Sequence, residues 1–182
     1  MSIPGLWFFT DPVRTPEPEA VALRLPVGAA VVYRAFGAGD SALVARRLAA
    51  ISRRRGLRLL IGADAVLAAA VGADGVHLPQ RLMHLAPRLA RAHPGWLISA
   101  AAHDAAAIVA GERFGLDALV VSAVFPSRSP SAGPALGPVR FAALIRRARV
   151  PIIALGGVTN KNAPRLLSTG AAGMAAVDGL AG

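Results

Sequence analysis

Short apolar runs recur along the whole chain, and most of them are rich in Val, Ile, Leu and Ala. Runs of this length that are apolar throughout are typical of parallel strands, which are buried on both faces. The pattern predicts eight strands, over residues 6–10, 29–35, 57–61, 76–78, 96–100, 116–124, 151–157 and 173–177.

Between these runs, apolar residues recur every three or four positions, as they do on one face of a helix. Asp40 or Ser41 precedes the clearest such segment, and Gly56 follows it. Asp64 and Asp104 stand at the start of two others, and all are residue types that cap helices. The predicted helices cover residues 17–25, 41–55, 65–71, 83–92, 105–114, 139–148 and 160–170.

Alternation of strands with helices favours an α/β protein with a parallel sheet. Eight such repeats predict a compact (β/α)8 TIM barrel, although these barrels usually exceed ~200 residues and this chain has 182. An open doubly wound sheet is the alternative. No linker or change of composition divides the chain, so we expect a single domain over residues 1–182. It lacks a last, eighth helix, and we expect a second copy to cover that flank in a homodimer.

Composition and charge narrow the functional classes. The chain has no cysteine and no apolar run long enough for a membrane span, and its start lacks the features of a signal peptide. These features predict a cytoplasmic protein without membrane contact. The net charge is +10, and nineteen of the twenty basic residues are arginine. Because the arginines are spread over predicted helix faces and helix ends, we expect them to be solvated rather than to bind nucleic acid.

The seventh run, PIIALGG, carries the first functional signal. It ends in Gly156 and Gly157, and residues suited to a helix start follow at 160–162. Two glycines after a strand let a ligand approach the backbone closely, and free N–H groups in such loops can bind a phosphate. The pattern predicts a phosphate site at the carboxyl end of the barrel.

Three blocks of sequence resemble the thiamine phosphate synthase and TenI family. They are ADGVHLPQ at 73–80, SAVFPSRS at 122–129 and ALGGVTNKNAPRLLSTGAAGMAAV at 154–177. The resemblance covers nearly the whole chain, and its spacing matches the family. It implies a (β/α)8 barrel, usually dimeric, that handles a thiazole phosphate. The family includes synthases, which join a pyrimidine diphosphate to thiazole phosphate with magnesium, and TenI-type proteins, among them a thiazole tautomerase.

Departures from the synthase pattern concentrate on the metal and diphosphate side. Where synthases carry an Asn-Asp pair after the third strand, this chain has Gly62 and Ala63. The aspartate after the fourth strand is replaced by Leu82, and the lysine of the loop after the sixth strand by Pro130. Departure of diphosphate needs a carboxylate-held metal to neutralise charge. The chain therefore resembles the TenI type more closely, and we expect no metal cofactor.

A metal-independent isomerisation needs a group that accepts and donates protons near neutral pH, and histidine suits both roles. The resemblance assigns the catalytic role to His103, just past the fifth strand. Arg34, at the end of the second strand, is a candidate anchor for a carboxylate or second anion. The ligand expected is a small phosphorylated thiazole. The remaining residues expected to hold it are Ser127, Arg128, Ser129, Gly156, Gly157 and Val177.

Three other interpretations remain open. The chain could be a synthase whose magnesium is held by Asp11, Asp40 or Asp64, or a non-catalytic barrel that binds a phosphorylated ligand. A nucleic-acid-binding protein is a more distant alternative. In the family a serine ends the eighth strand, but this chain has Asp178, whose charge would repel a phosphate unless it is paired or turned away.

The other histidines have structural roles in this interpretation. We expect His77, which lies in an apolar run, to be a satisfied core or rim residue. His84 and His93, on a helix and at its end, are expected at the surface.

Overall fold

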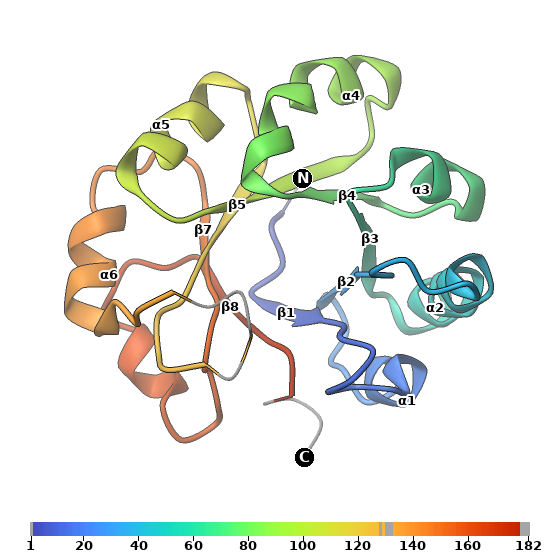
Figure 1. The fold of residues 1–182 in the computed structure, drawn as a ribbon, viewed down its shortest axis with the longest axis horizontal. Helices are drawn as coiled ribbons and strands as arrows, with labels where there is room; N and C mark the ends of the chain where they lie inside the picture. Colours follow the sequence, from blue (N-terminus) through green and yellow to red (C-terminus); the bar gives the residue numbers. More distant parts are fainter. Residues whose placement is uncertain (1, 128, 130–132, 179–182) are drawn as a thin grey trace.

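The computed structural model describes residues 2–127, 129 and 133–178. Within these residues, eight parallel strands form a closed barrel in which each strand pairs with its neighbours in sequence and β8 pairs with β1. Figure 1 views the molecule down its shortest axis. The strands are β1 (Leu6–Phe9), β2 (Ala30–Tyr33), β3 (Arg58–Gly62), β4 (Gly75–Leu78), β5 (Leu97–Ala102), β6 (Ala118–Val121), β7 (Ile152–Ala154) and β8 (Gly173–Ala176). The predicted (β/α)8 barrel is confirmed, and the pairing of β1 with β8 excludes an open sheet.

The helical elements surround the barrel (Figure 1). They are α1 (Pro18–Ala22), α2 (Ser41–Arg55), α3 (Ala65–Val71), η1 (Gln80–Leu85), α4 (Ala86–Ala92), α5 (Ala105–Arg113), α6 (Gly137–Ile145) and η2 (Ala163–Leu166), where η denotes a 3-10 helix. No described residue forms a helix after β8. The described helices include none long and apolar enough to cross a bilayer.

Several predicted helix boundaries are confirmed at the level of hydrogen bonds. A side-chain oxygen of Asp64 accepts the N–H of Leu67 at 2.8 Å, and one of Asp104 accepts the N–H of Ala107 at 2.7 Å. Gly56 ends α2 in the left-handed conformation, at φ +64°. At the start of α2, however, the side chain of Asp40 makes no capping bond.

The helix predicted over 160–170 is wrong, because only η2 forms there. Asn162 accounts for much of the difference. Its side chain accepts the N–H of Thr159 and donates to the carbonyl of Gly157, both at 2.8 Å. Such bonds between amide side chains and nearby backbone favour turns over helices, and Pro164 removes a backbone donor. The predicted sixth strand is also too long, since the ladder ends at Val121.

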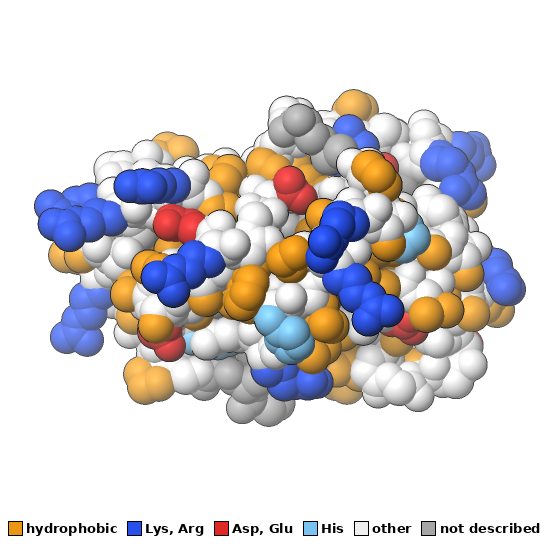
Figure 2. Space-filling model, turned by 90° about the horizontal axis from the view of Figure 1, so that it is seen from above, with side chains coloured by type: hydrophobic (Ala, Val, Ile, Leu, Met, Phe, Trp, Pro, Cys, Tyr) orange, Lys and Arg blue, Asp and Glu red, His pale blue; other side chains and the backbone are white. Residues whose placement is uncertain are grey.

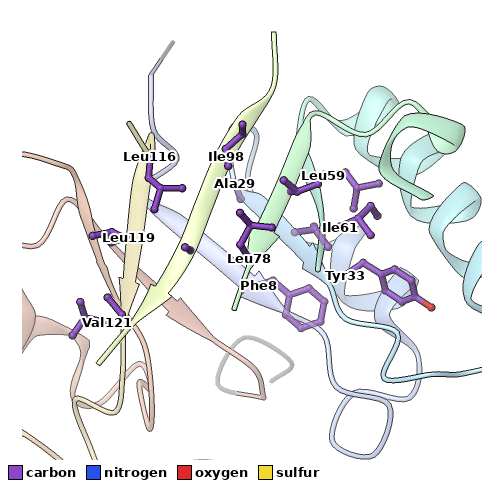
Figure 3. Close-up of a cluster of buried hydrophobic side chains, with 14 of the residues drawn as sticks. Phe8, Ala29, Tyr33, Leu59, Ile61, Leu78, Ile98, Leu116, Leu119 and Val121 are labelled. Atoms are coloured by element: carbon purple, nitrogen blue, oxygen red, sulfur yellow. The ribbon is translucent and has the colours of Figure 1, made fainter. Parts of the chain in front are cut away.

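The apolar side chains form two layers. The smaller one fills the barrel interior and includes Trp7 and Phe9 of β1, Leu60 of β3 and Ile153 of β7. The larger lies between the barrel and the helices, and Figure 3 shows the members that successive strands contribute to it. Side chains that alternate between the two faces of each strand explain why the strands are apolar almost throughout.

Close approach of β4 and β5 yields a stability prediction at Gly75. A Cβ atom built there would overlap the carbonyl oxygen of Leu97. We expect Gly75→Ala to lower the free energy of unfolding by at least about 2 kcal/mol, measured by urea denaturation, because the backbone must shift to admit the methyl group. Gly95→Ala is the control, since a Cβ atom there meets nothing within 4 Å. Equal stability of the two variants would contradict this packing.

Candidate active site

A cavity of about 500 Å³ opens at the carboxyl ends of the strands. Its wall takes residues at or just beyond the ends of strands all around the barrel, among them Gly62 at the end of β3, Ala101 in β5, Leu155 after β7 and Ala176 in β8. Active sites of (β/α)8 barrels lie at this end, and the volume suits a small organic ligand.

Gly156 and Gly157 form one wall of the cavity, and both have positive φ, +99° and +62°. A Cβ atom at Gly156 would lie 2.7 Å from Cα of Ala123, and one at Gly157 would overlap the carbonyl oxygen of Pro126. The loop after β6 therefore packs directly on the two glycines, and it is bound there by the N–H of Phe125, which donates to the Gly156 carbonyl at 2.9 Å. Only glycine fits both the conformation and the close approach.

In the loop after β7, the carbonyls of Gly156 and Gly157 accept hydrogen bonds from the N–H of Phe125 and from the side chain of Asn162. Among the described residues we find no acceptor for the backbone N–H of Gly156, Gly157 or Val158, which all line the cavity. Unpaired N–H groups beside a cavity can donate hydrogen bonds to an anion. The arrangement has the chemistry of the phosphate site predicted from the sequence.

The other predicted binding residues lie around the same cavity. Ser127 and Ser129 line it on the loop after β6, where Oγ of Ser127 accepts the N–H of Ser129 at 3.2 Å. Val177 lines it after β8, and Arg34 and His103 line it directly after β2 and β5. Arg128 lies outside the described residues. The predicted residues that the structure describes are thus brought together.

Asp178 also lines the cavity, and it is paired. Its two carboxylate oxygens accept hydrogen bonds from Nη2 and Nε of Arg14, at 2.5 and 3.3 Å. Arg14, on the loop after β1, lines the cavity as well. This two-point ion pair neutralises the carboxylate, so the repulsion expected between Asp178 and a bound phosphate is reduced.

Arg34 is fixed by several contacts at once. Its Nε donates to the Thr10 carbonyl at 2.8 Å, and its Nη2 lies 3.8 Å from the Asp11 carboxylate. The guanidinium lies over the rings of Phe9 and Phe36, at 5.5 and 5.0 Å from their centroids. Burial lowers the pKa of Arg34 and the Asp11 charge opposes this, but an arginine remains cationic in either case. A rigid cation therefore faces the cavity.

His103 is exposed directly after β5, and two contacts orient it. Its backbone N–H donates to Oε1 of Gln80 at 3.2 Å, and its ring Nδ1 lies 3.1 Å from the carbonyl oxygen of Ser122. A carbonyl only accepts, so Nδ1 must carry the proton. In the neutral ring Nε2 then holds the lone pair. His103 thus has the tautomer that a general base requires.

His77, expected to be a satisfied core or rim residue, is 8% exposed and lines the floor of the cavity. Its Nδ1 lies 3.0 Å from Oγ of the fully buried Ser99. Burial, with a smaller contribution from the charge of Arg34, lowers the pKa of His77 to about 3. The ring is therefore neutral at physiological pH. His84 is exposed as predicted, but His93 is half-buried and stacks on Trp96 at 3.6 Å.

The side chains present do not fit a magnesium site of the synthase kind. Gly62 and Ala63 line the cavity where carboxylate and amide ligands would be needed, and Asp178 is the one carboxylate among the described lining residues. Asp11, Asp40 and Asp64, the alternative ligands, are not gathered, since the described residues contain no group of three acidic or histidine side chains that could hold a metal. Carboxylate oxygens are the ligands that magnesium prefers.

The cavity wall also contains residues that sequence reasoning did not assign to the site, among them Arg14, Phe36, His77 and Arg81. The role of Arg14 could have been predicted from the expected barrel. A closed barrel places the loop after β1 beside the end of β8, where the Asp178 carboxylate would otherwise lack a cationic partner. Phe36 is 65% exposed and has a φ of +47°, which is rare outside glycine. No local sequence pattern marks that conformation.

A nucleic-acid interface predicts a contiguous basic stripe on the surface. Figure 2 shows one face of the molecule, on which the Lys and Arg side chains are dispersed among apolar and uncharged groups. This face has no such stripe among the described residues. Some arginines were expected at helix ends, where the helix dipole favours cations. Arg53, Arg54 and Arg55 indeed lie in the last turn of α2.

Residues 7–180 match the family described as thiamine monophosphate synthase. The chain belongs to that family. It is 30% identical to a thiamine-phosphate synthase of Methanospirillum hungatei, in a match that covers 95% of this chain and 87% of the relative. It is 34% identical to a putative thiamine-phosphate synthase of Geobacter sulfurreducens, over 75% of this chain but only 65% of that protein.

A solved structure supports the same assignment. Thiamine phosphate pyrophosphorylase from Pyrococcus furiosus superposes with a TM-score of 0.80 at 26% identity, covering 94% of this chain and 84% of the other. Membership of a family of thiamine biosynthesis is therefore established. The two relatives are named thiamine-phosphate synthase, one of them as putative, and the solved structure is named pyrophosphorylase; none of these three is named as a tautomerase.

The Arg14–Asp178 pair predicts how charge controls anion binding. We expect Asp178→Asn to raise the affinity for inorganic phosphate several-fold, because it removes a negative charge and releases Arg14 to the anion. Isothermal titration calorimetry measures the effect. Asp40→Asn removes the same charge away from the cavity wall and is the control. Unchanged or weaker binding by Asp178→Asn would show that the pair does not adjoin the anion site.

The depressed pKa of His77 predicts a dependence of stability on pH. Below about pH 6.5 the unfolded chain takes up a proton at His77, whereas the folded chain does so only near pH 3. The stability that the neutral ring contributes is complete above pH 6.5 and falls as the pH drops. Between pH 7.5 and 4.5 we expect the wild type to lose about 2–3 kcal/mol more than His77→Gln.

Urea denaturation at the two pH values measures this difference. The contribution of titrating carboxylates is the same in the wild type and in His77→Gln, so it cancels in the comparison. The exposed His84 provides the matched control, since His84→Gln should follow the wild type. Parallel pH curves for His77→Gln and the wild type would mean that His77 titrates normally in the folded protein.

Proposed function

We propose that the cavity binds a small thiazole phosphate and isomerises it without a carboxylate-held metal, as a thiazole tautomerase does. The observation that carries the proposal is the position of His103, oriented with Nε2 as base, in the same cavity as the unpaired N–H groups of Gly156 and Gly157. The first group suits proton transfer and the second suits a phosphate.

The residues supply each part of this reaction. The phosphate is held by backbone N–H groups at Gly156 and Gly157 and by the hydroxyls of Ser127 and Ser129. Nε2 of His103 removes a proton from one position of the ring system and returns it at another. In between, the imidazolium donates from Nδ1 to the Ser122 carbonyl, which stabilises the positive charge. The proton is conserved, so no co-reactant is needed.

The positive charge of the wall suits a ligand with more than one anionic group. Arg14, Arg34 and Arg81 line the cavity against a single described carboxylate, Asp178. Arg34 directly follows β2, whereas the glycine loop follows β7, so we assign Arg34 to a second anionic group such as a carboxylate on the ring. A phosphorylated carboxythiazole has both groups.

A synthase reaction is the second candidate, because the relatives reported above are named thiamine-phosphate synthase or pyrophosphorylase. In that reaction the pyrimidine diphosphate would lose diphosphate as it joins the thiazole phosphate. The lack of a carboxylate pair after β3 and β4 argues against it. Non-catalytic binding at the same cavity is the remaining alternative.

Substitution of His103 tests the proposal. We expect His103→Gln to lower the turnover of a carboxythiazole phosphate tautomer by about 10²–10⁴-fold, with ligand affinity unchanged within a few-fold. Ultraviolet absorbance of the ring follows turnover, and calorimetry follows binding. His84→Gln should match the wild type. Full activity in His103→Gln would refute the assignment, and binding without turnover in the wild type would favour a non-catalytic barrel.

The same preparation decides between isomerase and synthase. We expect no release of diphosphate from the pyrimidine diphosphate and thiazole phosphate, with or without magnesium. Release that depends on magnesium would establish the synthase reaction and overturn the main proposal.

A further inference from the structure

Two polar groups that the proposed proton transfer does not use meet on one aromatic ring at the cavity floor. The guanidinium carbon of Arg34 lies 5.5 Å from the centroid of the Phe9 ring, over its face. The ring of His77 meets Phe9 edge-on, with centroids 5.0 Å apart and an interplanar angle of 88°. All three side chains line the cavity. Phe9 therefore holds a cation and an imidazole in one corner of the site.

One nitrogen of His77 faces the cavity. Nδ1 is bound to Oγ of Ser99, and we find no partner for Nε2 among the described residues. Nε2 is not fully buried either, since Oγ of Ser52 is the one buried side-chain polar atom left unpaired in the described part of the chain. The small exposed surface of His77 thus opens into the cavity that it lines.

The side chain of Arg34 is likewise preorganised for binding a ligand. Its guanidinium lies over both Phe9 and Phe36, and its Nε is occupied by the Thr10 carbonyl. These contacts restrict the side chain, so little conformational entropy is lost when its remaining N–H groups bind an acceptor.

We propose that Arg34 and His77 form a second polar subsite, which binds the carboxylate or an equivalent acceptor group of the phosphorylated ligand. In this subsite the Ser99 hydroxyl donates to Nδ1 of His77, so Nε2 carries the proton and donates to the ligand. His77 is then a binding residue and Ser99 a positioning residue that fixes the tautomer. The inference rests on the proposed function, because it concerns the same ligand and cavity.

Such a subsite selects among phosphorylated ligands. A ligand without the acceptor would leave the N–H of His77 and those of Arg34 unpaired in a partly dry pocket, which disfavours binding. The phosphate, at the glycine loop, would contribute equally for both kinds of ligand. The subsite therefore determines how much more tightly a ligand with the acceptor group binds than one without it, whereas the phosphate contributes to the binding of both.

The test uses two thiazole phosphates that differ only in a carboxylate on the ring, titrated calorimetrically into the full chain. We expect the wild type to bind the carboxylated compound at least about tenfold more tightly, as one charge-assisted hydrogen bond allows. His77→Phe should remove most of this preference, and Ser99→Ala part of it. His93→Gln, away from the cavity wall, should leave it unchanged.

A double substitution separates positioning from general damage to the fold. If Ser99 acts through His77, then adding Ser99→Ala to His77→Phe should not lower the preference further. Equal affinity of the wild type for both compounds, or a preference that survives in both single variants, would overturn the subsite alone. If neither compound binds the wild type, the proposed function fails, and the subsite fails with it. Ser99→Ala keeps the test valid should His77→Phe not fold.

Discussion

Parallel pairing between β8 and β1 closes the sheet, and the geometry of the candidate site depends on that closure. The pairing matches Phe8 with Ala176, which sets the loop after β1 beside the end of β8. Arg14 and Asp178, 164 residues apart in sequence, consequently meet as a two-point ion pair. In an open doubly wound sheet the first and last strands would not pair, and Asp178 would face a bound phosphate without its partner.

Within the closed barrel, burial gives two histidines different chemistry. His103 is exposed at the rim, and a backbone carbonyl selects the tautomer with a free Nε2. His77 lies on the floor, where burial and the nearby Arg34 keep its ring neutral. In the proposed reaction His103 carries the proton and His77 is a fixed hydrogen-bonding group, and one residue type can serve both roles because their surroundings differ.

Sequence reasoning predicted what depends on local pattern. Apolar strands, the capping aspartates at 64 and 104, and the left-handed Gly56 all follow from residues close together in the chain. The segment 160–170 was predicted wrongly because the amide side chain of Asn162 bonds to nearby backbone and stabilises a turn. Contacts such as Arg14 with Asp178 depend on barrel closure. Position 157 requires glycine for a second reason besides its positive φ, namely the close approach of the Pro126 carbonyl. That approach depends on the packing of the loop after β6. Neither contact can be read from sequence spacing alone, although the predicted closure of the barrel pointed to the contact of Arg14.

The chain belongs to the thiamine monophosphate synthase family but lacks that family's metal-binding residues. The two findings are compatible if this chain keeps only the phosphate-binding part of the site. The expected homodimer stays a prediction, which sedimentation can test. The most direct measurement of the central claim is a ¹H–¹⁵N titration of the chain with inorganic phosphate. The account predicts saturable shifts of the Gly156, Gly157 and Val158 amide signals. Shifts confined to the arginines of α2, with the glycine loop unaffected, would contradict it.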